Sequence, residues 1–282
     1  PDNLDDNEDS KINESGNESL NETVNQTEEV REPELIEVPY EEGCDNINPL
    51  HCMFPFPSNV FLREDSTTVT GYRVNYTKTT VPGSGTFRQV EIPGLNRLDG
   101  MSPSTQILTA FDEDPVLTGV ANQSTIEKSL IAAHATILVN LDTGERLPHW
   151  VELDFRTDNK GPTILYIRTI RGLDHNTAYG VGISGLTNST GGLISPSLAF
   201  KALIEGDYTN APDVELRAAS FDNLFVSLES HGYEREELQE AWEFHTASTE
   251  SIVGGMLHMR EDALDRLGDD GIGWFMRIIP GE

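Results

Sequence analysis

Basic residues are scarce in this chain of 282 residues. It has 19 lysines and arginines against 48 aspartates and glutamates, which gives a formal net charge of −29. Such a protein is repelled by polyanions at long range, so nucleic acid and anionic membranes are poor partners. Residues 1–42 hold 15 of the acidic and 2 of the basic residues. The remaining 240 residues are acidic as well.

Long apolar runs are also missing. No stretch of about 18 apolar residues occurs, so the sequence predicts no transmembrane segment. The chain begins at Pro1 without a basic region followed by an apolar one, and we expect any signal peptide or lipid anchor to have been removed or not to be included in this sequence. Near the other end, the strand-like run Trp274–Ile279 stops three residues before Glu282. We therefore expect a piece of a longer protein.

Cysteine occurs only twice, at Cys44 and Cys52. Two cysteines this close, in a loop rich in Asn and Pro, can close a small disulfide ring in an oxidising compartment. The alternative is a pair of free thiols in a reducing cell. A zinc site is disfavoured, because two ligands do not make the four that zinc requires.

Catalytic motifs are absent or incomplete. The closest approach to the G-x-S-x-G elbow of serine hydrolases is Gly182-Ile183-Ser184-Gly185-Leu186, which lacks the second glycine at the required place and precedes no expected helix. Ser184 is therefore interpreted as a polar turn residue. The seven histidines are scattered, and none forms the H-E-x-x-H pair of a zinc protease. We predict no catalytic residue and no cofactor.

One acidic cluster is compatible with a bound metal ion. Asp112-Glu113-Asp114 lies in an expected loop, with Asp99 upstream, so that oxygen ligands for a structural Ca²⁺ are available. The spacing does not match an EF-hand. A solvated acidic loop is the favoured interpretation.

Asn-x-Ser/Thr sequons occur seven times, and four of them repeat every four residues in the acidic N-terminal stretch. They predict a glycosylated stalk on a cell surface, or they arise by chance in a segment rich in Asn, Ser and Thr. The candidate asparagines are Asn13, Asn17, Asn21, Asn25, Asn75, Asn122 and Asn188.

Three regions follow from the pattern of the chain. Residues 1–39 lack aromatic residues and apolar periodicity, so we expect a disordered acidic tether. Residues 40–205 alternate in short runs between turn signals, which predicts a mainly β fold, an Ig-like β-sandwich of seven or eight strands. The turn at 142–145 predicts a hairpin between strands at 136–141 and 150–155. Residues 206–282 change to a helical period and form a C-terminal helical segment.

Several elements are expected in that last region. A helix capped by Asp213 has apolar positions that include Leu216 and Leu228, and a short helix covers 234–240. A strand follows at 241–246. A final helix spans 249–267 with Ile252 and Met256 among its inward residues.

Two stretches resemble a known family. Phe54-Pro55-Phe56-Pro57-Ser58, followed by Leu95-Asn96-Arg97-Leu98-Asp99-Gly100-Met101-Ser102, resembles the opening of the bacterial virulence-factor lipase N-terminal domain, with its proline-rich entry and L-N-x-L-D-G-F-S type motif. Met101 departs from the usual aromatic but keeps bulk and apolarity. The motif residues, interpreted as structural, are Phe54, Pro55, Pro57, Asn96, Asp99, Gly100 and Ser102.

The resemblance implies that an α/β-hydrolase domain with the nucleophile follows in the same chain. We accordingly expect a non-catalytic accessory module of an extracellular or surface-anchored lipase or esterase, with that hydrolase domain as its partner. Whether the whole protein is an enzyme stays open. The alternative is a surface adhesion or structural module of Ig-like repeats with no enzyme attached.

Overall fold

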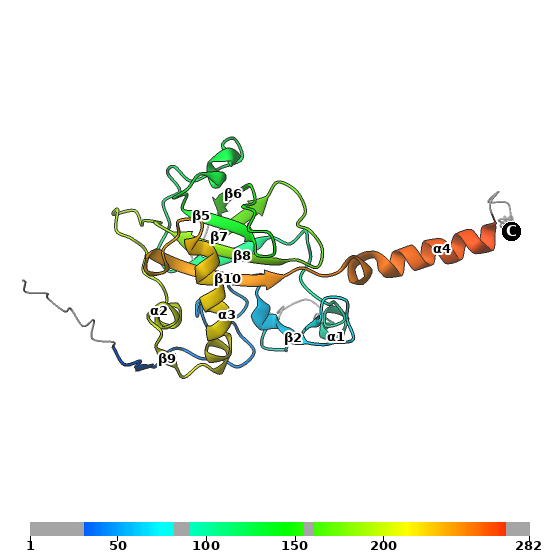
Figure 1. Ribbon diagram of the computed structural model, residues 1–282, viewed down its shortest axis with the longest axis horizontal. Helices are drawn as coiled ribbons and strands as arrows, with labels where there is room; N and C mark the ends of the chain where they lie inside the picture. The colour runs from blue at the N-terminus through cyan, green and yellow to red at the C-terminus, as the bar shows by residue number, and fades with distance from the viewer. Residues whose placement is uncertain (1–30, 82–90, 155–160, 269–282) are drawn as a thin grey trace, which may run out of the picture. The chain divides into compact units, whose positions relative to one another are not determined.

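The computed structural model describes residues 31–81, 91–154 and 161–268 (Figure 1). The strands are β1 (Leu35–Ile36), β2 (Leu62–Glu64), β3 (Tyr72–Val74), β4 (Ile107–Phe111), β5 (Thr136–Asn140), β6 (His149–Leu153), β7 (Thr163–Thr169), β8 (Ala178–Ser184), β9 (Tyr208–Thr209) and β10 (Leu238–His245). The helices are η1 (Asn59–Phe61), α1 (Ile92–Leu95), η2 (Ile126–Leu130), α2 (Leu198–Glu205), α3 (Pro212–Glu229), η3 (Arg235–Glu237), the π-helical η4 (Glu250–Gly254) and α4 (Gly255–Leu267).

Two antiparallel sheets of three strands contain the longer strands, in the orders β10-β8-β5 and β4-β7-β6. Smaller pairs are β2 with β3 and the parallel β1 with β9. Strand and helix make up comparable shares, 24% and 27%. The fold is therefore mixed, with several small antiparallel sheets, and helix is a larger part of it than the expected mainly β class allows.

The expected hairpin at residues 142–145 forms only next to its turn, where Val139 and Arg146 make an antiparallel bridge and Leu147 N donates to Leu138 O at 2.8 Å. Both strands exist, and Gly144 turns with a φ of 73°. However, β5 pairs with β8, whereas β6 pairs with β7. Alternation of apolar residues identified the strands, but it carries no information about which strand lies beside which.

Helix α3 packs on the β10-β8-β5 sheet over two glycines of β8. A Cβ on Gly180 would lie 2.7 Å from Leu224 Cδ1, and one on Gly182 would lie 3.2 Å from Leu228 Cδ1. The absence of side chains there lets the helix approach the strand closely. Figure 1 shows α3 (yellow) beside β8 and β10. The opposite row of β8, which includes Tyr179 and Val181, is buried as well.

Order begins earlier than expected. Leu35–Ile36, assigned from sequence to the disordered tether, form β1 and pair in parallel with Tyr208–Thr209. Val38 is buried, and its N–H donates to Asn210 Oδ1 at 2.7 Å. The expected disorder of residues 1–30 falls outside the described residues.

Part of the expected C-terminal helical segment, residues 206–282, packs on the region before it. β10 joins the sheet by pairing with β8 along its length, and its Trp242 is fully buried. The expected helix at 234–240 is only the single turn η3, and residues 238–240 already belong to β10. Asp213 does not cap α3, whose N-cap is Ala211. Leu216, expected inside, is 86% exposed.

The final helix is present, but its apolar side chains do not point inward. Ile252, Met256 and Met259 are 37%, 62% and 65% exposed, and no residue of α4 is buried. Among the described residues, no helix is long and apolar enough to cross a membrane.

Candidate functional site

A cavity of about 340 Å³ lies where four segments meet: the loop 39–50, the end of β4, the loop 194–197 that leads into α2, and the start of β10. Its lining residues are Pro39, Asn46, Ile47, Asn48, Pro49, Leu50, Ala110, Phe111, Asp112, Glu113, Ile194, Ser195, Pro196, Ser197, Leu198, Ala199, Gln239 and Glu240. The volume lies within the range of about 300–1,000 Å³ that is typical of small-molecule sites.

Glu240 is the buried carboxyl group of this cavity, with only 4% of its surface exposed. Its Oε1 accepts a hydrogen bond from Asn48 Nδ2 at 2.9 Å, and its Oε2 accepts one from Thr109 Oγ1 at 2.5 Å. Asn48 Nδ2 also lies 3.0 Å from the carbonyl oxygen of Ala110. The carboxyl group is thus fixed by side chains from two different segments.

A β-bulge contributes to the orientation of Glu240. Leu238 pairs with Ser184 and Glu240 with Ile183, so that Gln239 is the extra residue. Bulges of this kind redirect side chains and are common beside functional sites. Glu240 continues the row of Trp242 and Phe244, which are both buried. The other side chains on this face of β10 are apolar and pack in the core, so a carboxyl group there breaks the local pattern. Such exceptions are expected at functional or strained sites.

The pKa of Glu240 is raised to about 7. Burial is the largest cause, because it disfavours the charged form. The hydrogen bonds from Thr109 and Asn48 act in the opposite direction, and the negative charge of Asp45 raises the pKa further. Both protonation states are therefore populated near neutral pH.

The loop that carries Asn48 is held by a covalent ring. Cys44 and Cys52 form the expected disulfide, with an S–S distance of 2.03 Å. On the far side of the loop, Ser197 Oγ donates to the carbonyl oxygen of Ile47 at 2.5 Å. The wall of the cavity is fixed at both sides before any ligand arrives.

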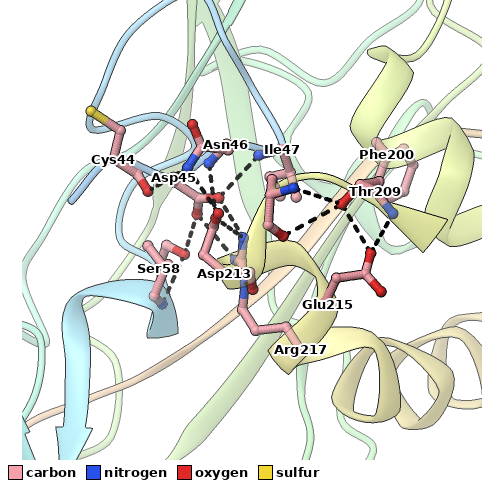
Figure 2. A network of polar contacts seen from close by, with 12 residues as sticks. Cys44, Asp45, Asn46, Ile47, Ser58, Phe200, Thr209, Asp213, Glu215 and Arg217 are labelled. Atoms are coloured by element: carbon pink, nitrogen blue, oxygen red, sulfur yellow. Dashed lines mark hydrogen bonds and ion pairs between the residues drawn. The ribbon is translucent and has the colours of Figure 1, made fainter. Parts of the chain in front are cut away.

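Arg217 of α3 anchors the same loop from below, as Figure 2 shows. Its Nη2 lies 2.7 Å from Asp45 Oδ1 and 3.2 Å from Asp213 Oδ2. Asn46 Nδ2 donates to Asp213 Oδ1 at 2.8 Å, and Ser58 Oγ donates to Asp45 Oδ2 at 2.5 Å. Burial alone would lower the pKa of Arg217, but the charge of Asp45 and its hydrogen bond raise it. The guanidinium therefore remains charged.

The lining of this cavity contains acidic and neutral residues but no lysine, arginine or histidine among the described residues. Asp112 and Glu113 are exposed, and Leu50, Phe111 and Ile194 supply apolar surface. The cavity therefore combines apolar walls with negative charge.

Sequence reasoning missed this site. It assigned residues 234–240 to a short helix and did not single out Glu240. The available signal was the alternation that runs back from Phe244 through Trp242 to Glu240, which places the carboxylate on the core side of a strand.

The family-motif residues lie elsewhere, around the end of β10. Asp99 is buried, its Oδ1 accepts from Ser248 N at 2.9 Å, and its Oδ2 accepts from Ser248 Oγ at 2.6 Å. A Cβ on Gly100 would lie 2.6 Å from Ala247 N. These two residues fix the chain at the point where it leaves β10 for η4.

The other motif residues are also held by structural contacts. The Asn96 side chain exchanges two hydrogen bonds of 2.9 Å with the backbone of Tyr76. Phe54 is buried, and the bonds that precede Pro55 and Pro57 are both cis. Ser102 is exposed.

The remaining candidates do not assemble into a centre. Ser184 ends a strand that continues into a turn at Gly185, with a φ of 72°, and not into a helix. Glu113 accepts from Asn188 Nδ2 at 2.5 Å, and Asp114 accepts from Thr163. In the described part of the chain, no three His, Cys, Asp or Glu side chains converge to hold a metal ion.

The sequons divide into three groups. Asn75 and Asn122 are exposed. Asn188 is half-buried, and its Oδ1 accepts hydrogen bonds from Thr190 and Gly192. Asn13, Asn17, Asn21 and Asn25 lie outside the described residues.

In comparisons with known proteins, no family model and no curated protein matched the chain.

Proposed function

We propose that this chain is a non-catalytic accessory module of an extracellular, lipase- or esterase-like protein, and that a hydrolase domain of the same protein docks on its C-terminal helix. The observation that carries the proposal is the exposed apolar surface of η4 and α4. Ile252, Met256 and Met259 recur at spacings of four and three residues, which places them on one helical face. An apolar face of this kind is stabilised by a partner surface.

The position of the motif residues supports the same proposal. Asp99 and Gly100 belong to the stretch that resembles the lipase N-terminal domain, and both contact the segment 246–248 at the base of this helix. Ser251 Oγ accepts from Asp99 N at 3.1 Å as well. In this proposal, the motif sets the direction in which the helix leaves the sheet.

We propose that the two three-stranded sheets form a β-sandwich of the Ig-like class. In support, the two three-stranded sheets contribute Leu165, Ile167, Val181 and Ile183 to one buried cluster, and successive strands such as β5 and β6 alternate between them. The disulfide supports an oxidising, extracellular compartment.

Ester hydrolysis tests the proposal. The longer reading frame and residues 1–282 are assayed on p-nitrophenyl esters of short and long acyl chains. We expect turnover only in the longer protein. Turnover by residues 1–282 alone would contradict a non-catalytic module, and inactivity of both would favour the adhesion or structural alternative.

Docking is tested separately in the longer protein. The double variant Met256→Glu/Met259→Glu should separate the two domains, seen as two unfolding transitions in calorimetry in place of one. Leu216→Glu/Val226→Glu is the matched control, because those residues are exposed apolar positions of another helix. An equal effect of both pairs would contradict docking at α4.

A further inference from the structure

We propose that the cavity beside Glu240 is a binding site for a small organic cation, an ammonium group carried on an apolar body of about six carbon atoms. The inference is independent of the accessory role, because none of the residues that form this cavity belongs to η4 or α4.

The carboxyl group supplies the first argument. A carboxylate offers about four acceptor sites, and the two bonds from Asn48 and Thr109 occupy one on each oxygen. Acceptor capacity therefore remains on a group that is buried and lines the cavity. An ammonium group has three N–H donors and no acceptor, which matches the acceptor positions that remain on this carboxylate.

Charge supplies the second argument. The charged groups near Glu240 are acidic: Asp45, whose charge raises the pKa of Glu240 although Arg217 pairs with it, and the exposed Asp112 and Glu113 of the lining. No basic side chain of the described lining can meet an anionic ligand. A buried carboxylate is stabilised when a cation pairs with it and further hydrogen bonds satisfy it, and Asn48 and Thr109 already provide those bonds.

Shape supplies the third argument. The cavity of about 340 Å³ has apolar walls from Leu50, Phe111 and Ile194, which suit a short hydrocarbon body. The disulfide ring holds the wall that carries Asn48, so binding orders little of the protein, and affinity benefits from that pre-organisation.

The test compares three probes of equal length, hexylammonium, hexanol and hexanoate, by calorimetric titration of residues 1–282 at pH 8 in 0.15 M NaCl. We expect hexylammonium to bind at least about tenfold more tightly than hexanol, with hexanoate weakest. Equal affinity for hexylammonium and hexanol, or tighter binding of hexanoate, would overturn the proposal.

Two variants distinguish binding in the cavity from non-specific attraction of a cation to the acidic surface. Glu240→Gln preserves the size of the side chain and can still accept from Asn48, and it should reduce hexylammonium affinity to that of hexanol. Glu236→Gln removes the same charge from an exposed position on η3 and should leave the affinity unchanged. Equal losses in the two variants would show surface attraction and overturn the site.

A pH series keeps the test decisive if Glu240→Gln does not fold. Hexylammonium stays protonated between pH 6 and pH 8, whereas Glu240 becomes ionised across that interval because its pKa is about 7. The affinity of the unmodified protein should rise about tenfold, as the ionised fraction does. An affinity that does not change with pH would contradict pairing with Glu240.

Discussion

Arg217 pairs with two carboxylates, those of Asp45 and Asp213. The loss of stability on removing Arg217 depends on how well water can reach the carboxylates that remain. The side chain of Asp45 has no exposed surface, so it depends on the guanidinium for compensation of its charge. Removing one member of such a pair leaves an uncompensated buried charge, which costs about 3–5 kcal/mol. Replacing both members by neutral groups avoids that cost.

Arg217→Met should therefore lower the free energy of unfolding by about 3–5 kcal/mol in urea denaturation. The double variant Asp45→Asn/Arg217→Met should lose less than Arg217→Met alone, because the stranded carboxylate is gone. If the double variant were the less stable of the two, the charge would not be the cause.

His149 gives stability that depends on pH. Burial lowers its pKa to about 4, whereas the unfolded chain has the ordinary value of 6.5. The unfolded state therefore takes up a proton before the folded state does. The contribution to stability is complete above pH 6.5 and is lost as the pH falls toward 4, by up to about 3 kcal/mol. Glu240 acts in the opposite sense, since its raised pKa gives stability that is lost as the pH rises from 4.5 toward 7.

We predict that His149→Gln reduces the loss of unfolding free energy between pH 7 and pH 5 by about 1–2 kcal/mol. Thermal or urea denaturation at the two pH values measures it. His258→Gln on α4 is the control, because that side chain is exposed. A pH dependence of the same size in His149→Gln and the unmodified protein would contradict the assignment.

At the scale of elements, the joint between β10 and η4 depends on close backbone contact. The position of Gly100 admits no side chain, since an added Cβ would lie within 2.8 Å of three backbone atoms of residues 246 and 247. Backbone cannot move aside as a flexible side chain can. With a side chain at position 100, the end of β10 and the loop that carries Gly100 would have to move apart. The hydrogen bonds that Asp99 accepts from Ser248 would then be strained.

Gly100→Ala should destabilise the protein by about 1–3 kcal/mol, as overpacking does elsewhere. Gly172→Ala is the matched control, because its nearest contact would be an ordinary 3.7 Å to Ser104. Chemical denaturation of both variants gives the comparison. Equal free energies of unfolding for the two variants would mean that the backbone around Gly100 can shift without cost.

The elements differ in how well sequence predicted them. Strands β5, β6 and β10 and the apolar position of Leu228 on α3 were predicted because their periodicity is local. The pairing of β5 with β8 was not, since register depends on contacts far apart in the chain. The final helix was located correctly, but its apolar residues were placed inward, because amphipathicity does not say which surface covers the apolar face.

At the scale of the whole molecule, charge and fold carry separate information. The net charge of −29 predicts poor binding of polyanions, and nothing in it indicates where a ligand binds. The cavity is formed by segments near residues 48, 110, 197 and 240, which no local pattern connects. The disulfide could be predicted from spacing, whereas the carboxyl site required the bulge, the register and the loop together.

The Cys44–Cys52 ring has a mechanical consequence. A pulling force applied at residue 31 first loads the short pairing of β1 with β9, and then reaches Cys44. From there, the tension crosses the sulfur–sulfur bond to Cys52 and bypasses residues 45–51. Asn46 and Asn48 lie in that bypassed stretch. A chain stretched from its N-terminal side would therefore lose β1 first, while residues 45–51, the part of the loop that carries Asn46 and Asn48, carry no load.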